Sequence, residues 1–432
     1  MADGWNDVLR DKRDLARERA YQEPIETLNP ARASAFRDDA QWVYFDRLRA
    51  EDPVHYTPES NYGAFWSITK YRDIMEVDTN HQVFSSAKGI ALSPKMSALP
   101  PEAQELVNRA SAPSFISMDP PDHDTQRKTV SPAVAPHQLA QMAPQIRERA
   151  GLILDALPIG VPFDWVDLVS KELTTMTLAT LFDFPFEERR KLTFWSDTMT
   201  TAPGHGPVAT YAEQRAALND CRDYFVDLWN QRVNAEPAGD LISLLAHGPT
   251  TRDCSMSEFF SNVTLLIIGG NDTTRNTISG SIYALNRNPD QYDKLRANPG
   301  LIPSMVSETI RWQTPLAHMS RTANQDFEFR GKTIREGDKV VMWYVSGNRD
   351  DEVIERPYDY IIDRPRPREH LSFGFGIHRC VGNRLAELQL TIIWEEILKR
   401  FPEVQVLEEP RRSYSIFVKG YEDMKVLIPR RN

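Results

Sequence analysis

Cysteine is scarce in this sequence, whose 432 residues contain only Cys221, Cys254 and Cys380. Three widely spaced cysteines are too few for a disulfide framework, which predicts a protein of a reducing compartment, the cytoplasm. Positive charge is also in deficit: 51 lysines and arginines face 61 aspartates and glutamates, a formal net charge of −10. This balance argues against nucleic acid or an anionic membrane as the main partner.

Long apolar runs are missing from the start of the chain, where residues 1–20 are densely charged. No stretch there is long enough for a signal peptide or a membrane anchor, so we expect a soluble protein. Internal repeats and Gly/Ser-rich linkers are absent as well. We therefore expect an irregular polar arm over residues 1–40, followed by one domain over residues 41–432. A hydrophobic content of 41% is enough to bury a large core.

Helical patterns dominate the middle of the chain. Ser255 and Glu258 form a capping box that predicts a helix of about 30 residues, stopped by Pro289. Residues 84–117 show little periodicity and are expected to form a long loop. Short strands are predicted toward both ends of the chain, at residues 54–56, 64–68, 327–329, 339–344, 404–407, 414–418 and 424–428. The predicted fold is mainly α with a smaller β-rich part.

The segment FGFGIHRCVG, residues 373–382, places Cys380 between a glycine-rich turn and a predicted helix. At a helix N-terminus the helix dipole and free N–H groups favour thiolate over thiol. A thiolate in this position is a good soft ligand for iron. The plainer alternative is a buried structural cysteine in an ordinary turn. The loop is not a dinucleotide-binding fingerprint, because the third glycine of that motif is missing. It is not a zinc site either, because the further Cys/His pairs that bind zinc are missing.

The spacing Phe-x-x-Gly-x-x-x-Cys-x-Gly, with His378 two residues before Cys380, resembles the haem-ligand loop of the cytochrome P-450 family. The segment GGNDTT, residues 269–274, lies inside the predicted long helix and resembles the oxygen-activation motif of that family. The resemblance implies that Cys380 binds the haem iron, Thr273 hydrogen-bonds the dioxygen co-substrate and Asp272 feeds a proton relay. The alternative for the second segment is a kinked core helix with Asp272 as a surface charge.

Two further sets of residues follow from the same resemblance. Glu308 and Arg311 match the structural Glu-x-x-Arg pair of the family, with Arg349 and Arg364 as candidates for a third partner. The propionates of the haem are expected to be held by His123, Arg127, Arg321 and His378. The other residues expected to border the haem are Gly269, Gly270, Phe373 and Gly376.

Two longer strings, residues 269–277 and 370–401, resemble the bacterial soluble alkane hydroxylases of this family. The implied activity is a haem-thiolate monooxygenase that hydroxylates the terminal (omega) carbon of medium-chain alkanes or fatty acids. A terpenoid or steroid hydroxylase of the same family is the main alternative. The presence of Asp272 and Thr273 argues against three other functions, namely a peroxide-driven peroxygenase, a haem sensor and an electron carrier. An apolar tunnel is expected, with candidate walls at Ile90, Leu92, Leu266, Leu316, Ala317 and Phe417.

The resemblance also implies the cofactor and the partners. The cofactor is haem b with an axial thiolate, and O2 is the co-substrate. Electrons are expected from NAD(P)H through a flavoprotein reductase and a ferredoxin, because the chain has neither a flavin domain nor a cluster-binding cysteine set. Arg379, Arg384 and Lys128 are candidates for a basic docking patch despite the net negative charge. We expect a monomer.

Overall fold

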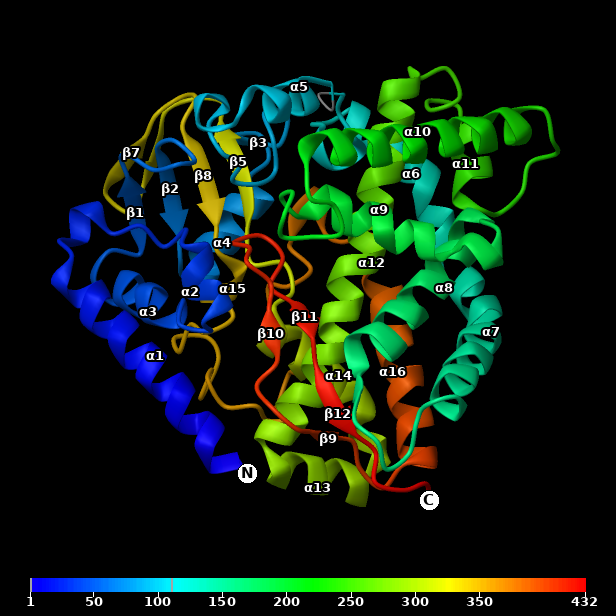
Figure 1. Cartoon of the computed structure of the whole chain (residues 1–432). Helices are drawn as coiled ribbons and strands as arrows, with labels where there is room; N and C mark the ends of the chain where they lie inside the picture. The colour runs from blue at the N-terminus through cyan, green and yellow to red at the C-terminus, as the bar shows by residue number, and fades with distance from the viewer. Residues whose placement is uncertain (1, 110–111) are drawn as a thin grey trace.

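Helix α12 (Met256–Arg287) runs through the middle of the molecule, as the computed structural model of residues 2–109 and 112–432 shows (Figure 1). Its start is the predicted capping box, in which Glu258 N–H donates to Ser255 Oγ at 3.2 Å and Ser255 N–H donates to Glu258 Oε2 at 3.0 Å. Pro289 ends α12 as predicted, but it also starts a new helix, α13 (Pro289–Ala297).

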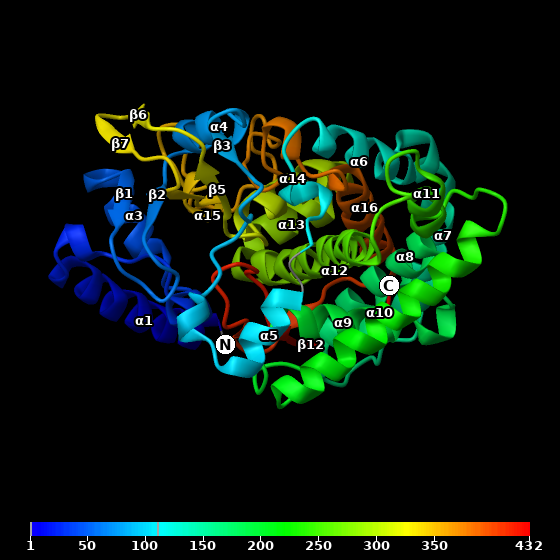
Figure 2. The same cartoon turned by 90° about the horizontal axis from the view of Figure 1, so that it is seen from above.

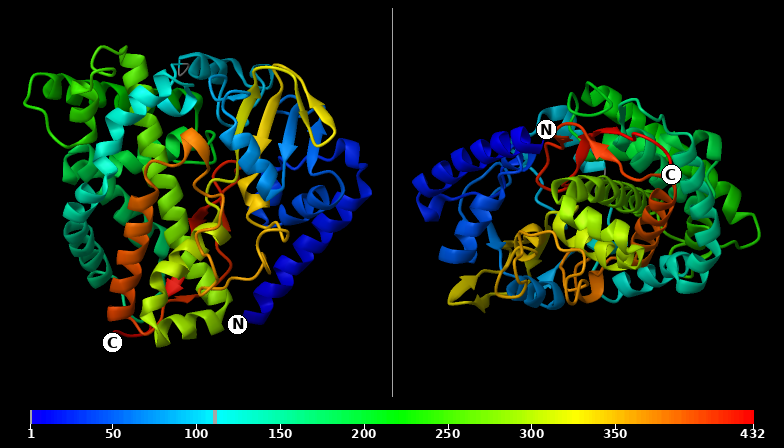
Figure 3. Two further views of the ribbon diagram at one scale, coloured as in Figure 1. Left: turned by 180° about the vertical axis from the view of Figure 1, so that it is seen from behind. Right: turned by 90° about the horizontal axis from the view of Figure 1, so that it is seen from below.

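The other helices of the body surround α12. Seen from above, α9 and α10 lie on one side of α12, and α14 and α16 lie on the other (Figure 2). Seen from behind, α16 runs beside α12, and both chain termini lie at the same end of the molecule (Figure 3). The bounds are α6 (Asp122–Val130), α7 (Pro136–Asp155), α8 (Glu172–Phe182), α9 (Arg190–Thr200), α10 (Tyr211–Val233), α11 (Leu241–His247), α14 (Ile302–Gln313) and α16 (Asn383–Arg400).

The β-rich part is built on a five-stranded sheet of order β1-β2-β8-β5-β3. The predicted hairpin is present, with Val54 opposite Ile68, and β8 pairs parallel to β2 and antiparallel to β5. The sheet includes β5 from the last third of the chain, which pairs with β8 on one side and with β3 on the other. Its strands are β1 (Val54–Thr57), β2 (Phe65–Ile68), β3 (Phe84–Ser85), β5 (Met319–Ala323) and β8 (Lys339–Met342).

Short strands and helices complete the fold. Two-stranded sheets join β6 (Phe327–Phe329) to β7 (Lys332–Ile334) and β10 (Arg411–Arg412) to β11 (Tyr421–Asp423). A three-stranded sheet joins β4 (Phe163–Asp164), β12 (Lys425–Leu427) and β9 (Gln405–Val406). The helices beside the β-rich part are α2 (Ala33–Arg37), α3 (Trp42–Glu51), α4 (Tyr71–Thr79), α5 (Pro101–Arg109) and α15 (Tyr344–Gly347). No helix over residues 2–109 and 112–432 carries an apolar stretch long enough to cross a membrane.

Three sequence predictions about local structure were wrong. The expected arm contains helix α1 (Ala2–Gln22), which packs on α3 along the outer edge of the β-rich part (Figure 1). Over residues 10–22 its buried side chains are those of Ala16 and Ala20, which carry little hydrophobic signal. The expected 84–117 loop contains β3 and α5. Residues 414–418 form no strand, since they pair only through a bridge between Leu316 and Val418.

Replacing Ala20 by phenylalanine should lower the free energy of unfolding by about 1–3 kcal/mol, because this fully buried methyl group leaves no room for a ring. Urea unfolding measures the change. Leu15→Phe on the same helix is the control: Leu15 is 49% exposed, and its substitution should change stability by less than about 0.5 kcal/mol. Equal effects of the two substitutions would contradict the packing of α1.

Candidate active site

A cavity of about 310 Å³ lies between α12 and the loop that carries Cys380. Gly269, Gly270 and Thr273 line it from α12, and Phe373 and Cys380 line it from the loop. The accessible surface of Cys380 faces this cavity, so the thiol is accessible although it lies deep in the protein. The structure thus brings the two sequence motifs, more than a hundred residues apart, to opposite walls of one space.

Backbone contacts fix the shape of the Cys380 loop. Gly374 and Gly376 have φ values of +66° and +65°, a region that favours glycine. A Cβ atom at Gly376 would lie 2.7 Å from the carbonyl oxygen of Asp78, so α4 excludes any larger residue there. Gly376 was expected to border the haem, but it packs on α4 instead of lining the cavity. The N–H of Cys380 donates to Phe373 O at 2.8 Å and closes the turn.

Asp78 holds this loop in place, and no pattern in the sequence indicates this role. Its Oδ2 accepts hydrogen bonds from the Phe375 N–H at 2.8 Å and from the Tyr344 hydroxyl at 2.9 Å. Its Oδ1 forms an ion pair with Arg321 Nη2 at 2.8 Å. One buried carboxylate therefore ties α4, strand β5 and the glycine turn together.

The thiol of Cys380 does not have the lowered pKa that the sequence predicted. Burial raises its pKa, while the Gly382 N–H and the charges of Arg127 and Arg379 act in the opposite direction. Gly382 is the N-cap of α16, so the helix terminus contributes but does not outweigh desolvation. A metal cation bound to the sulfur would supply positive charge there and hold the thiol in its deprotonated form.

Polar groups at one edge of the cavity fit the carboxylates of a haem. Both ring nitrogens of the buried His378 and Nε2 of the buried His123 lack hydrogen-bond partners in the part of the chain that the structure describes. Arg127 and Arg321 line the cavity, and Arg127 also donates to the carbonyl of Arg379. Burial lowers the pKa of His378, and the nearby charge of Arg321 lowers it further. Buried donors of this kind normally meet an acceptor.

His123 is placed differently from its three expected companions. It does not line the cavity; its ring contacts the ring of His378 edge-on, with centroids 4.4 Å apart. Nδ1 of His123 lies 2.8 Å from Asp124 Oδ1, which leaves Nε2 as the open nitrogen. His123 therefore packs against the ring of His378, and its Nε2 is a second nitrogen without a partner among the described residues.

The paired glycines of α12 have two different explanations. A Cβ atom at Gly269 would meet no atom within 4 Å among the described residues, so this position opens toward the cavity. A Cβ atom at Gly270 would lie 2.6 Å from Leu178 Cδ2, so this glycine allows α8 to approach. The Thr273 hydroxyl donates to the carbonyl of Gly269 at 2.9 Å, as expected for a threonine inside a helix.

Asp272 is fully buried and faces α9, which rules out the alternative of a surface charge. Its Oδ1 accepts from Ser196 Oγ at 3.2 Å and pairs with Arg275 at 3.1 Å. Burial raises the pKa of Asp272, and the charge of Arg275 opposes this shift. Arg275 pairs in turn with Asp197 at 2.5 Å, and the partly exposed Lys171 lies 3.5 Å from Asp197. A polar path thus leads from Asp272 toward the molecular surface.

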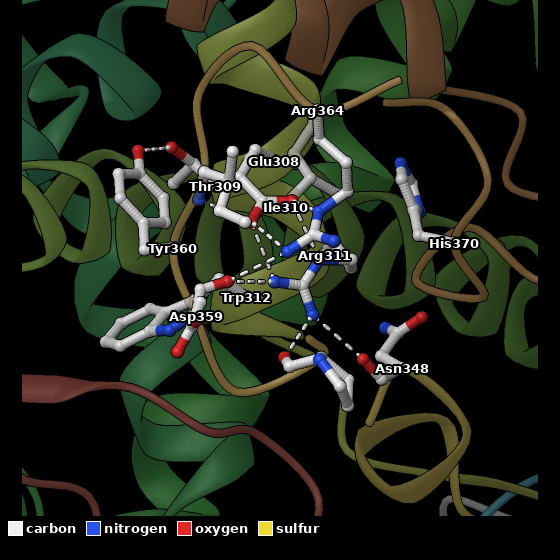
Figure 4. A network of polar contacts seen from close by, with 12 residues as sticks. Glu308, Thr309, Ile310, Arg311, Trp312, Asn348, Asp359, Tyr360, Arg364 and His370 are labelled. Carbon is white, nitrogen blue, oxygen red and sulfur yellow. Dashed lines mark hydrogen bonds and ion pairs between the residues drawn. The ribbon is translucent and has the colours of Figure 1, made fainter. Parts of the chain in front are cut away.

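The Glu308–Arg311 pair is completed by Arg364. Arg311 donates to both carboxylate oxygens of Glu308 at 2.8 Å, and Arg364 Nε donates to Oε2 at 3.1 Å. Figure 4 shows both guanidinium groups turned toward the carboxylate. Burial raises the pKa of Glu308, but the two arginines more than offset this and leave it below its ordinary value. The other candidate, Arg349, lies elsewhere, with its guanidinium over the ring of Trp42.

Hydrogen bonds connect this ion-pair network to the Cys380 loop. Arg311 Nη1 donates to the carbonyl of Asn348 at 2.9 Å (Figure 4). The Asn348 side chain accepts from the Leu371 N–H at 2.7 Å and donates to Ser372 Oγ at 2.9 Å. Ser372 directly precedes Phe373, the first residue of the loop. The network therefore positions the segment from which the cysteine loop begins.

The rest of the cavity wall is mostly apolar. Four of the six predicted wall residues line it, namely Ile90, Leu266, Leu316 and Phe417. Leu92 and Ala317 do not, because they are buried in a core cluster around Trp343. Sequence reasoning missed Phe115, Ile116, Leu178, Leu181, Leu241 and Leu265. Leu178 and Leu181 share one face of α8, but helical periodicity alone cannot tell a cavity wall from solid core.

Comparison with known proteins identifies the family. The sequence model described as "Cytochrome P450" matches residues 300–420. Linalool 8-monooxygenase from Pseudomonas putida is 34% identical, covering 89% of this chain and 95% of that protein. The structure of CYP153D17 from Sphingomonas sp. PAMC 26605 is 45% identical, with a TM-score of 0.86 over 94% of this chain and 100% of that one. Cytochrome P450-153 from Novosphingobium aromaticivorans is 42% identical, with a TM-score of 0.85 over 93% and 99%.

The chain belongs to the cytochrome P450 family, as its motifs predicted. It is a monooxygenase that uses a thiolate-ligated haem iron, O2 and electrons from a redox partner. The predicted fold class, mainly α with a smaller β-rich part, is confirmed as well.

Replacing Arg364 by leucine should destabilise the protein by about 3–5 kcal/mol, because it leaves the buried carboxylate of Glu308 with one arginine instead of two. Urea unfolding at neutral pH measures the loss. The control is Arg368→Leu, whose side chain is 77% exposed and whose ion pair lies at the surface. A loss of unfolding free energy no larger than that of Arg368→Leu would contradict the proposed contribution of Arg364 to stability.

The same pair predicts an acid dependence. The pKa of Glu308 lies below its ordinary value of 4.5, so its stabilising contribution is present above pH 4.5 and is lost as pH falls through the lower folded-state value. Arg364→Leu should weaken this acid dependence, because it removes part of the cause of the shift. Unfolding curves recorded between neutral pH and about pH 3 compare the two proteins.

Proposed function

We propose that this enzyme hydroxylates the terminal carbon of a medium-chain apolar substrate, with an alkane preferred over the free fatty acid of similar length. The observation that carries the proposal is the distribution of charge in the cavity. Among the described residues that line it, the only arginine or lysine side chains are Arg127 and Arg321. Both lie at the edge that fits the cofactor carboxylates, and Arg321 is already paired with Asp78.

A carboxylate inside this cavity would therefore lack a cation away from the cofactor edge. Burying an unpaired carboxylate costs several kcal/mol, whereas an alkane only has to fit the shape of the apolar wall. Leu178, Leu181, Leu265 and Leu266 supply much of that wall from α8 and α12. The arrangement favours a chain that is held by shape and has no polar end to anchor.

The names of two relatives support oxidation of a chain end. Linalool 8-monooxygenase is the relative described above, and methyl-branched lipid omega-hydroxylase from Mycobacterium bovis is 31% identical over 405 residues. The second candidate function, hydroxylation of a terpene alcohol, is favoured by the first of these names. Both candidates place a terminal carbon near the cofactor and differ in the shape of the rest of the substrate.

Each residue of the site has a proposed role in the reaction R–H + O2 + 2e− + 2H+ → R–OH + H2O. Cys380 would hold the haem iron through its thiolate, and haem b bound there would supply the oxygen-activating chemistry. His378, His123, Arg127 and Arg321 hold the cofactor carboxylates. The apolar wall orients the substrate and excludes water.

Proton delivery is assigned to α12. The raised pKa of the Asp272 carboxyl allows it to hold and release a proton, and Arg275, Asp197 and Lys171 connect it to the periphery. The Thr273 hydroxyl lines the cavity and donates to Gly269 O, and rotation about its side-chain bond redirects that hydrogen into the cavity. Asp272 and Thr273 are adjacent, so the path reaches the cavity wall at this point.

The electrons are proposed to come from NAD(P)H through a flavoprotein reductase and a ferredoxin. Arg379, Arg384 and Lys128 are all exposed, and Arg379 directly precedes the cysteine. Ferredoxins are typically acidic, so this basic group offers complementary charge for docking. A cytoplasmic monomer remains part of the same proposal.

Product analysis with a reconstituted redox chain tests the substrate. Octane, dodecanoic acid and linalool are offered separately, and gas chromatography identifies the products. Octane should give 1-octanol, with kcat/KM at least about tenfold above that for dodecanoic acid, because the carboxylate lacks a cation in the cavity. Exclusive turnover of linalool would establish the second candidate in place of the first.

Replacing Thr273 by alanine should preserve substrate binding while diverting electrons to hydrogen peroxide. The expected loss of product per NAD(P)H oxidised is about 10- to 100-fold, because general acid–base groups contribute on this scale. The control is Thr277→Ala, one turn further along the same face, whose hydroxyl donates to the carbonyl of Thr273. Unchanged coupling in Thr273→Ala would remove its role in proton delivery.

A further inference from the structure

A second cavity, of about 490 Å³, is separate from the active-site cavity. Helices α1 and α3, the last turn of α12 and the end of α14 enclose it, together with the C-terminal segment at Lys419 and Tyr421. None of its described lining residues belongs to the active-site cavity. Its size is within the range of pockets that bind small organic molecules.

The charge of this cavity is opposite to that of the whole protein. Seven arginine and lysine side chains line it against three aspartates, in a chain whose net charge is −10. Asp39 pairs with Arg13 at 2.6 Å and Asp46 pairs with Arg49 at 2.5 Å, so two of the three carboxylates are already engaged. The pairs Arg13–Asp39 and Arg412–Glu409 are thus neutral, whereas Arg349, Lys419 and Arg287 form no ion pair with a described carboxylate within 4.0 Å.

Two of the cations are buried without an anionic partner. Arg349 is 2% exposed and Lys419 is 6% exposed, and no carboxylate of the described chain lies within 4.0 Å of either. Arg349 Nη2 donates to the carbonyl of Trp312 at 2.7 Å, while its Nε has no partner among the residues described. Lys419 Nζ donates to the carbonyl of Gln313 at 3.0 Å. Buried cations are normally paired with an anion.

Arg287 adds a third open donor at the rim. It occupies the last position of α12, and its buried Nη1 atom has no hydrogen-bond partner within the described ranges. The guanidinium of Arg349 lies over the ring of Trp42, with 4.5 Å between its carbon and the ring centroid, which holds it in a fixed orientation. Burial lowers the pKa of Lys419 to about 7, and Arg349, Arg412 and Arg13 add to the lowering against Asp39. An anion bound beside Lys419 would raise this pKa again and stabilise the charged form of the side chain.

We propose that this cavity, lined by Arg349, Lys419 and Arg287, binds a small organic molecule that carries two or more oxyanion groups. Arginine recognises carboxylate and phosphate oxygens by paired hydrogen bonds, and lysine adds a point charge. A phosphate ester and a polycarboxylate share this chemistry, and the experiment below separates them. The site is independent of the substrate proposed above, because the two cavities share no lining residue.

Isothermal titration of the haem-loaded protein tests the site. Pyrophosphate and citrate are titrated separately at matched ionic strength, against acetate as a monovalent reference. At least one of the two should bind with a dissociation constant below about 1 mM. The anion that binds more tightly shows whether the natural ligand is a phosphate ester or a polycarboxylate. The affinity should fall at least about tenfold in both Arg287→Gln and Lys419→Gln, since each substitution removes a positively charged hydrogen-bond donor.

The matched control is Arg296→Gln. Arg296 lies over the ring of Tyr292 four residues before it, as Arg287 lies over Tyr283, but it is outside the cavity. The control should bind the anion like the wild type. The carbon monoxide difference spectrum shows whether each variant keeps its thiolate-ligated haem, and the exposed part of Arg287 makes Arg287→Gln the variant to rely on if Lys419→Gln does not fold. Absence of binding by both anions, or equal affinity in Arg287→Gln and wild type, would overturn the proposal.

Discussion

The burial of one carboxylate, that of Glu308, constrains much of the structure around the active site. A charge taken out of water must be paired and hydrogen-bonded, and Glu308 is satisfied by Arg311, Arg364 and the N–H of Ile361. These partners come from segments up to 56 residues apart. Because Arg311 also contacts Asn348, the pairing extends to the residues that precede the cysteine loop. The geometry of the Cys380 loop thus depends on an ion pair that does not line the cavity.

The two cavities show how little the average composition says about local chemistry. The chain is acidic overall, yet one space is walled by leucines and the other by arginines. The segment from Phe417 to Lys419 takes part in both, since Phe417 lines the apolar cavity and Lys419 lines the cationic one. Neighbouring residues of an irregular segment point to opposite sides, and this lets a short stretch of chain separate two very different environments.

Sequence reasoning was successful where the chemistry is local and unsuccessful where it depends on distant contacts. The cysteine loop and the capping box of α12 follow from residues a few positions apart, and so they could be read directly. Asp78 acts on a loop almost 300 residues away, and no spacing in the sequence indicates it. Helix α1 was missed because its buried side chains over residues 10–22 are two alanines. Gly270 lines the cavity as expected, but its contact with Leu178 could not be inferred from the sequence. Wall residues such as Leu241 look like ordinary core until the cavity is seen.

The contacts of Asp78 have a consequence for substitutions near the loop. They join α4, Arg321 and the glycine turn through a single buried carboxylate. A buried acceptor that holds several donors cannot be removed or neutralised without leaving those donors unpaired. The loop that carries Cys380 is therefore most sensitive to change at a residue that lies outside its own sequence.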